Sequence, residues 1–171
     1  ISGVYELPFG RGKPLLNTTN PIVSRVVGGW QINGIYTYQT GAPLEFQNGN
    51  FGFNGNFSDI ALDNPTRERW INTDAGFNRR NEERLEWNVR TFPRWISSVR
   101  GHRLSSIDLS VIKNTSITER INVQFRGEAL NAFNSPHFAA PETNPTSANF
   151  GVVNGVLNYA RRIQLGLRVV F

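Results

Sequence analysis

The last segment of the chain, residues 161–171, alternates between apolar and polar side chains. The apolar positions are Ile163, Leu165, Leu167, Val169 and Phe171, and the positions between them include Arg162, Gln164, Gly166 and Arg168. A repeat of two places successive side chains on opposite faces of a β-strand, whereas a helix would need a repeat of about 3.6. The pattern therefore predicts a strand with one apolar and one polar face.

Four earlier segments show the same alternation: residues 1–9, 30–46, 105–117 and 121–133. In the last of these, Ile121, Val123 and Phe125 are separated by Asn122 and Gln124. The short sequence TSITER links the third and fourth segments, and a link of that length favours an antiparallel hairpin. We expect five antiparallel strands in all.

The connections between these segments differ in length. Residues 10–29 contain Asn20, Pro21 and Gly28, which suit the cap, the first position and the end of a short helical turn. Residues 47–104 and 134–160 form two long connections, while the hairpin turn is short. Short turns at one end and long loops at the other are typical of outer-membrane barrels, in which the short turns are periplasmic.

The alternation by itself also fits a soluble antiparallel sheet with one wet face. Three features favour a membrane: charged residues in mid-strand on the polar face, aromatic residues near strand ends, and a final strand whose alternation continues to Phe171. The predicted lipid-facing residues are Ile121, Val123, Phe125, Ile163, Leu165, Leu167 and Val169.

Composition narrows the functional classes. The 171 residues include no Cys, which excludes disulfides and thiolate chemistry, and no Met, from which we expect a piece of a longer protein. The net charge of +5 is scattered without a basic run, so nucleic acid is not an expected partner. His102 and His137 are interpreted as solvated loop residues, and no metal, nucleotide or nucleophile motif is found. We expect no enzyme activity, no cofactor and no metal site.

The long connection 47–104 carries the only candidate ligand site. Arginines and aromatic residues are interleaved there, a composition that can hold an anionic or sugar-like ligand through stacking and charge-assisted hydrogen bonds. The candidates are Arg67, Trp70, Arg79, Arg80, Trp87, Arg90 and Trp95. The alternative is that the aromatic residues pack the loop on itself while the arginines pair with Glu82, Glu83 and Glu86 and with phosphates of surface lipopolysaccharide.

Several ordered motifs resemble the C-terminal end of the barrel of TonB-dependent outer-membrane receptors, in particular the Oar-like group with an N-terminal carboxypeptidase-regulatory-like domain. They are YELPFGRGK (5–13), GGWQINGIYTYQTGAPLEF (28–46), RWINTDAGF (69–77), IDLSVIKNTSITERINVQFRGEALNAFNSPHF (107–138), NPTSANFG (144–151) and RRIQLGLRVVF (161–171). The resemblance implies that the terminal Phe171 belongs to the signal read by the barrel-assembly machinery. It also implies an upstream plug domain, further strands, an energy-transducing TonB complex and an imported ligand whose identity is unknown.

The expected fold is all-β: residues 1–171 form the C-terminal part of one antiparallel transmembrane β-barrel domain, with two long extracellular loops and short periplasmic turns. The expected function is ligand import across the bacterial outer membrane, with outer-membrane lipid around the barrel. Two alternatives stay open: a soluble β-sandwich that binds carbohydrate, and an outer-membrane adhesin or structural barrel that transports nothing.

Overall fold

A computed structural model describes residues 1–17, 20–46, 49–87 and 89–171. The chain divides into two compact units. The sheet unit comprises residues 1–38, 105–135 and 159–171, and the loop unit comprises residues 39–104 and 136–158. The first two residues of the predicted long loop, Gln47 and Asn48, lie outside the described residues.

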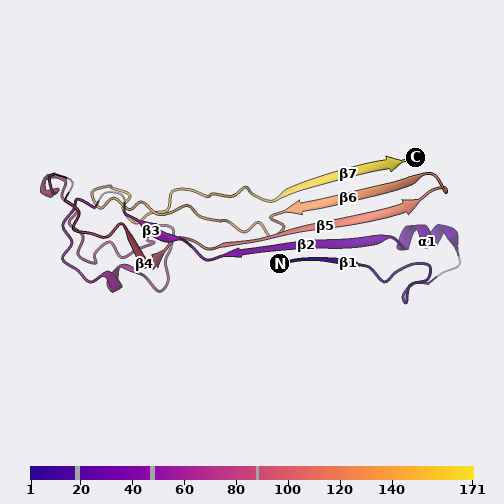
Figure 1. Cartoon of the computed structure of the whole chain (residues 1–171), viewed down its shortest axis with the longest axis horizontal. Helices are drawn as coiled ribbons and strands as arrows, with labels where there is room; N and C mark the ends of the chain where they lie inside the picture. The colour runs from indigo at the N-terminus through magenta and orange to yellow at the C-terminus, as the bar shows by residue number, and fades with distance from the viewer. Residues whose placement is uncertain (18–19, 47–48, 88) are drawn as a thin grey trace. The chain divides into compact units, whose positions relative to one another are not determined.

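The sheet unit is built on five strands: β1 (Ser2–Glu6), β2 (Trp30–Gln39), β5 (Leu104–Ser116), β6 (Asn122–Leu130) and β7 (Arg162–Val170). Figure 1 shows them side by side in the order β1, β2, β5, β6, β7. The β1–β2, β5–β6 and β6–β7 pairs are antiparallel, so the predicted hairpin of residues 105–117 and 121–133 is confirmed. Within the described ranges β1 and β7 do not pair with each other, and the sheet is open rather than a closed barrel.

Three predicted strands end earlier than expected, and the first of them, residues 1–9, ends at Glu6 as β1. The segment 30–46 divides into β2 and the separate short strand β3 (Pro43–Glu45), because Gly41 lies against another backbone where a Cβ would be 1.8 Å from the Gly101 oxygen. The segment 121–133 ends as a strand at Leu130, because Asn131 has a φ of +50° and its buried amide bonds to the backbone of Ser135 and Tyr159. At the ends of β2 and β6, local backbone geometry therefore stops the strand although the alternation of apolar and polar residues continues.

The register separates the two faces of the sheet. Leu167 pairs with Phe125, which pairs with Lys113, and side chains directly opposite each other in antiparallel strands share a face. This face carries the exposed apolar residues of β7, and we call it the apolar face. Lys113 is a cation on it that the alternation did not predict.

The opposite face, the polar face, is linked by side-chain hydrogen bonds across strands. The Asn33 amide donates to the Ser110 hydroxyl at 3.1 Å, and the Gln124 amide donates to the Asn114 carbonyl at 2.8 Å. Arg126 forms an ion pair with Glu128 on the same strand. These side chains of the polar face therefore pair with one another through hydrogen bonds and an ion pair.

The helix α1 (Pro21–Val27) lies in the connection between β1 and β2. The Asn20 side chain accepts from the backbone N–H groups of Ile22 and Val23, Pro21 occupies the first turn, and Gly28 follows the last turn, which confirms the predicted helical turn. Across the described ranges no helix has the length and apolar character needed to cross a membrane.

The loop unit has its own apolar core. It contains β3 paired antiparallel with β4 (Trp95–Arg100), and the short 3-10 helices η1 (Phe57–Ile60) and η2 (Asn81–Glu83). Phe46, Phe77 and Phe92 pack closely, with ring centroids of Phe46 and Phe92 4.9 Å apart. Neither β3 nor β4 was predicted as a strand of its own, so the prediction of five strands misses this second sheet.

Candidate functional site

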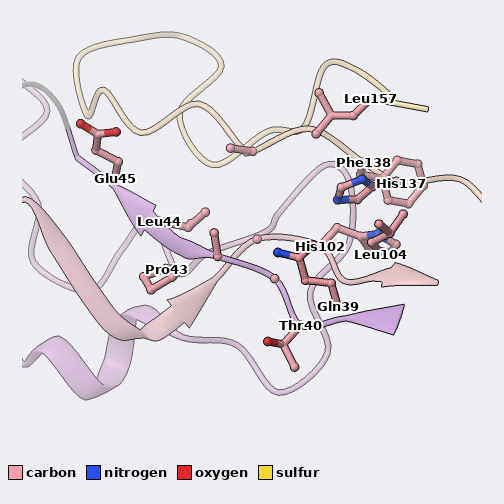
Figure 2. A pocket seen from close by; sticks show the side chains of 14 residues that line it. Gln39, Thr40, Pro43, Leu44, Glu45, His102, Leu104, His137, Phe138 and Leu157 are labelled. Atoms are coloured by element: carbon pink, nitrogen blue, oxygen red, sulfur yellow. The ribbon is translucent and has the colours of Figure 1, made fainter. Parts of the chain in front are cut away.

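A hollow of about 350 Å³ opens in the loop unit. Three segments line it. They are residues 39–45 before and through β3, the residues Gly101, His102 and Leu104 after β4, and the segment that contains His137, Phe138 and Ala140, with Leu157 beside it. Figure 2 shows these segments around the hollow. The lining is mostly apolar, with two imidazole rings and the Glu45 carboxylate as its ionisable groups.

Backbone contacts hold the lining segments in place. The Gly101 N–H donates to the Ala42 oxygen at 2.9 Å, and the Arg100 guanidinium donates to the Gly41 oxygen at 2.9 Å. On the other side, the His137 N–H donates to the Asn158 side chain at 2.7 Å. The hollow is thus built from backbone that is already hydrogen-bonded, which is the usual state of a pre-formed ligand site.

His102 is the most unusual residue of the lining. Its Nδ1 is buried and has no hydrogen-bond partner in the described part of the chain. Its ring centroid lies 4.8 Å from that of Phe138, 5.8 Å from that of Trp70 and 6.1 Å from that of His137. Buried polar atoms without a partner are rare in native proteins, because each one loses its hydrogen bond to water.

The surroundings of His102 favour the neutral form of its ring. Burial lowers the pKa of His102, and the charges of His137 and Arg103 lower it further. A neutral imidazole has one donor and one acceptor nitrogen, so it can receive a ligand group of either kind. His102 lies in a loop, as predicted, but it is half-buried and its Nδ1 is shielded from solvent rather than solvated.

Two of the seven predicted ligand residues, Arg67 and Trp70, contact the rings of Phe138 and His102. The Arg67 guanidinium carbon is 5.3 Å from the centroid of the Phe138 ring. The Trp70 indole N–H donates to the Arg100 oxygen at 2.8 Å, and its ring packs against the core of the loop unit. Neither residue lines the hollow itself.

The other five predicted residues are dispersed over the loop unit. Arg79 lies 5.8 Å from the centroid of the Phe150 ring, and Arg90 donates to the backbone oxygens of Phe46 and Phe92. Arg94 lies 4.6 Å from the centroid of the exposed Trp95 ring. These contacts fit the alternative stated from the sequence, in which arginines and aromatic residues of the loop serve its own packing.

Arg80 and Trp87 lie on the surface. Arg80 pairs with Glu83 at 2.8 Å, and hydrogen bonds from Arg80 and then Asn78 lower the pKa of Glu83. Trp87 is 90% exposed with a φ of +61°, a conformation that is uncommon for a residue with a side chain. The structure does not gather the seven predicted residues into one site.

The lining of the hollow was missed because no local signal marks it. His102 and His137 are 35 positions apart, and each follows a glycine or proline in a segment without periodicity. In the described residues no group of three or more His, Cys, Asp or Glu side chains could hold a metal ion.

Comparison with known proteins adds the family. The sequence model of one family, described as Outer membrane beta barrel domain, matches residues 1–164. No curated protein and no solved structure matches the chain. The match covers nearly the whole chain and agrees with its all-β, mostly antiparallel strands. The chain therefore belongs to the outer membrane beta barrel domain family and is a protein of the bacterial outer membrane.

Proposed function

We propose that this chain is the C-terminal part of the barrel of a TonB-dependent receptor of the Oar-like group, which binds a ligand outside the cell and imports it. The six sequence motifs support the receptor group, and membership of the barrel family sets aside the soluble carbohydrate-binding alternative. The remaining strands, the plug and the contact with the TonB complex belong to parts of the protein outside these 171 residues.

The observation that carries this proposal is that the two long connections fold together. The Trp70 N–H donates to the Gly151 oxygen at 2.8 Å, the Val153 N–H donates to the Arg67 oxygen at 2.7 Å, and the Thr143 hydroxyl donates to the Glu45 oxygen at 2.9 Å. Each bond joins segment 39–104 to segment 136–158. A loop surface that is ordered before the ligand arrives loses less conformational entropy on binding, which suits a receptor.

The hollow beside His102 is the best place for the ligand. Its apolar walls favour a ligand with an aliphatic or aromatic body, and the His102, His137 and Glu45 side chains of its lining favour a ligand that also carries a polar group. Nothing in this arrangement requires a cofactor, a metal or a chemical step. The site is proposed to bind and release a ligand unchanged.

The test begins with the natural polypeptide. Outer membranes of the source would be extracted with detergent, and the intact mass of the chain that carries RRIQLGLRVVF would be measured. A mass several times the 19.3 kDa of these residues is expected for a receptor with a plug. A mass near 19.3 kDa would overturn the proposal.

A second measurement separates import from adhesion. The full-length protein would be cross-linked to the purified periplasmic domain of TonB from the same source, with a variant lacking the segment before the plug as the control. Capture of the full-length protein but not of the control is expected. Equal capture of both, or of neither, would leave an adhesin or a structural barrel as the function.

A further inference from the structure

Side chains from the apolar face of the sheet hold the end of α1. The Trp30 indole N–H donates to the Val26 oxygen at 3.0 Å. The Lys113 ammonium donates to the Arg25 oxygen at 2.6 Å and also to the Gly28 oxygen. The same ammonium lies 5.5 Å from the centroid of the Trp30 ring. The last carbonyl groups of α1 are thus reached from the apolar face.

These contacts explain why a cation, Lys113, lies on the apolar face. A lysine in the apolar band of a barrel is costly in lipid unless its ammonium reaches polar partners near the interface. Lys113 does so by bonding to the carbonyl groups that α1 leaves without helical partners. The position of α1 at the rim of the apolar face is therefore specified by two side chains, Trp30 and Lys113, which both donate hydrogen bonds to backbone oxygens at the end of the helix.

The outer side of α1 is apolar and uncovered. Ile22 is 72% exposed and Val26 is 64% exposed. Residues four apart lie on the same side of a helix, while Ser24 lies on the opposite side and Arg25, three residues after Ile22, flanks the apolar side. A soluble helix would turn such residues toward a core, so their exposure calls for an apolar partner.

The chain around α1 is basic. Residues 7–29 contain Arg11, Lys13 and Arg25 and no acidic residue, but Lys13 pairs with the Glu6 carboxylate at 3.2 Å, which leaves Arg11 and Arg25 as the cations that can contact lipid. The Arg25 guanidinium also donates to the Ile117 oxygen at 3.3 Å, which ties α1 to the short turn between β5 and β6. Short turns of outer-membrane barrels are periplasmic, so these cations lie at the periplasmic rim. An apolar helix side together with nearby cations matches an interface lined by anionic phospholipid headgroups.

We propose that α1 is an interfacial anchor: its Ile22 and Val26 side chains enter the periplasmic leaflet of the outer membrane, and the Arg11 and Arg25 side chains bind the phosphate groups of anionic phospholipids. The lipid side of the sheet continues directly into this helix through Trp30 and Lys113. The inference requires the apolar face to contact lipid and is independent of ligand import, so the TonB cross-linking result does not affect it.

The test places a reporter on each side of α1. Single cysteines would be introduced by Val26→Cys and Ser24→Cys in the full-length protein, with any upstream cysteines changed to serine, and labelled with an environment-sensitive nitrobenzoxadiazole dye. Both proteins would be reconstituted in phosphatidylcholine vesicles with and without phosphatidylglycerol. Folding would be checked by heat-modifiable gel mobility, so that only folded barrels are compared.

Lipids carrying a quencher near the headgroup should quench the dye at position 26 more strongly than the dye at position 24. Phosphatidylglycerol should increase this difference, and Arg25→Gln should reduce the increase. Equal quenching at both positions would overturn the anchor. Quenching at neither position would show that water or upstream protein covers α1, and would also overturn it. A difference that phosphatidylglycerol leaves unchanged would overturn the assigned role of the cations.

Discussion

The substitution Leu167→Arg tests the assignment of the apolar face to lipid. Leu167 lies on β7, one position from Gly166 at the middle of the strand. Its side chain is 71% exposed, so the other residues of this chain leave most of it uncovered. At a rise of about 3.4 Å per residue, and with the tilt of barrel strands, its Cα lies within about 3 Å of the strand midpoint along the membrane normal.

An arginine near the bilayer midplane costs about 2 to 4 kcal/mol in the free energy of unfolding of a membrane barrel. That cost corresponds to roughly a 30- to 900-fold change in the unfolding equilibrium. The matched control is Gln164→Arg on the same strand. Gln164 faces the polar side, opposite the Arg126–Glu128 ion pair, so a new cation there stays among polar groups and remains hydrated.

The assay is urea unfolding of the full-length protein in phospholipid vesicles, followed by the gel mobility of the folded barrel. Leu167→Arg should lower the urea midpoint strongly, while Gln164→Arg should leave it nearly unchanged. Two outcomes would refute the assignment: both variants unfold at the same urea concentration as the parent protein, or both are equally destabilised. In either case the apolar face does not contact lipid.

Three further substitutions test the loop unit and the sheet. Phe92→Ala removes a ring that is 1% exposed and should destabilise the loop unit by about 3–5 kcal/mol. The variant should therefore speed protease cleavage of the long loops in the folded barrel. Trp87→Ala is the control and should leave the cleavage rate unchanged, because Trp87 is 90% exposed. Because the folded-state pKa of His102 lies below its ordinary value of 6.5, the folded loop unit binds fewer protons than the unfolded one, and its stability should fall as the pH drops through and below 6.5. Protease resistance measured against pH should show this loss in the parent protein, and a loss of the same size in His102→Phe would contradict it. Gly29→Ala should lower the folded yield in outer membranes, because Gly29 has a φ of +72° and a Cβ there would lie 2.2 Å from a backbone oxygen of β5. Gly3→Ala is the control, since its Cβ would meet nothing within 4 Å, and an equal loss of yield in both variants would contradict this reasoning.

Much of the candidate site lay beyond sequence reasoning. The interleaved arginines and aromatic residues of the long loop had the composition of a ligand site, but composition does not distinguish a residue that packs the loop from one that faces a ligand. Arg90 bonds to the backbone oxygens of Phe46 and Phe92, so its charge serves the interior of the loop. His102 lies in a segment without periodicity, and only the approach of Phe138 and His137 makes it unusual.

The sequence by itself determined the strands of the sheet, their two faces and the short hairpin. Successive side chains of a strand face opposite sides, so the environment of each face sets the residue type at every second position, and this pattern is local in the sequence. The sequence also determined α1, whose cap, proline and glycine are local signals. The tertiary structure alone decided how the two long connections fold. Phe77 meets Phe150 with ring centroids 4.9 Å apart although the two residues are 73 positions apart, and a contact of that kind leaves no period in either segment. The role of Lys113 was also decided by the tertiary structure. In the sequence it interrupts an apolar face, and only the fold brings its ammonium to the backbone oxygens of Arg25 and Gly28 at the end of α1.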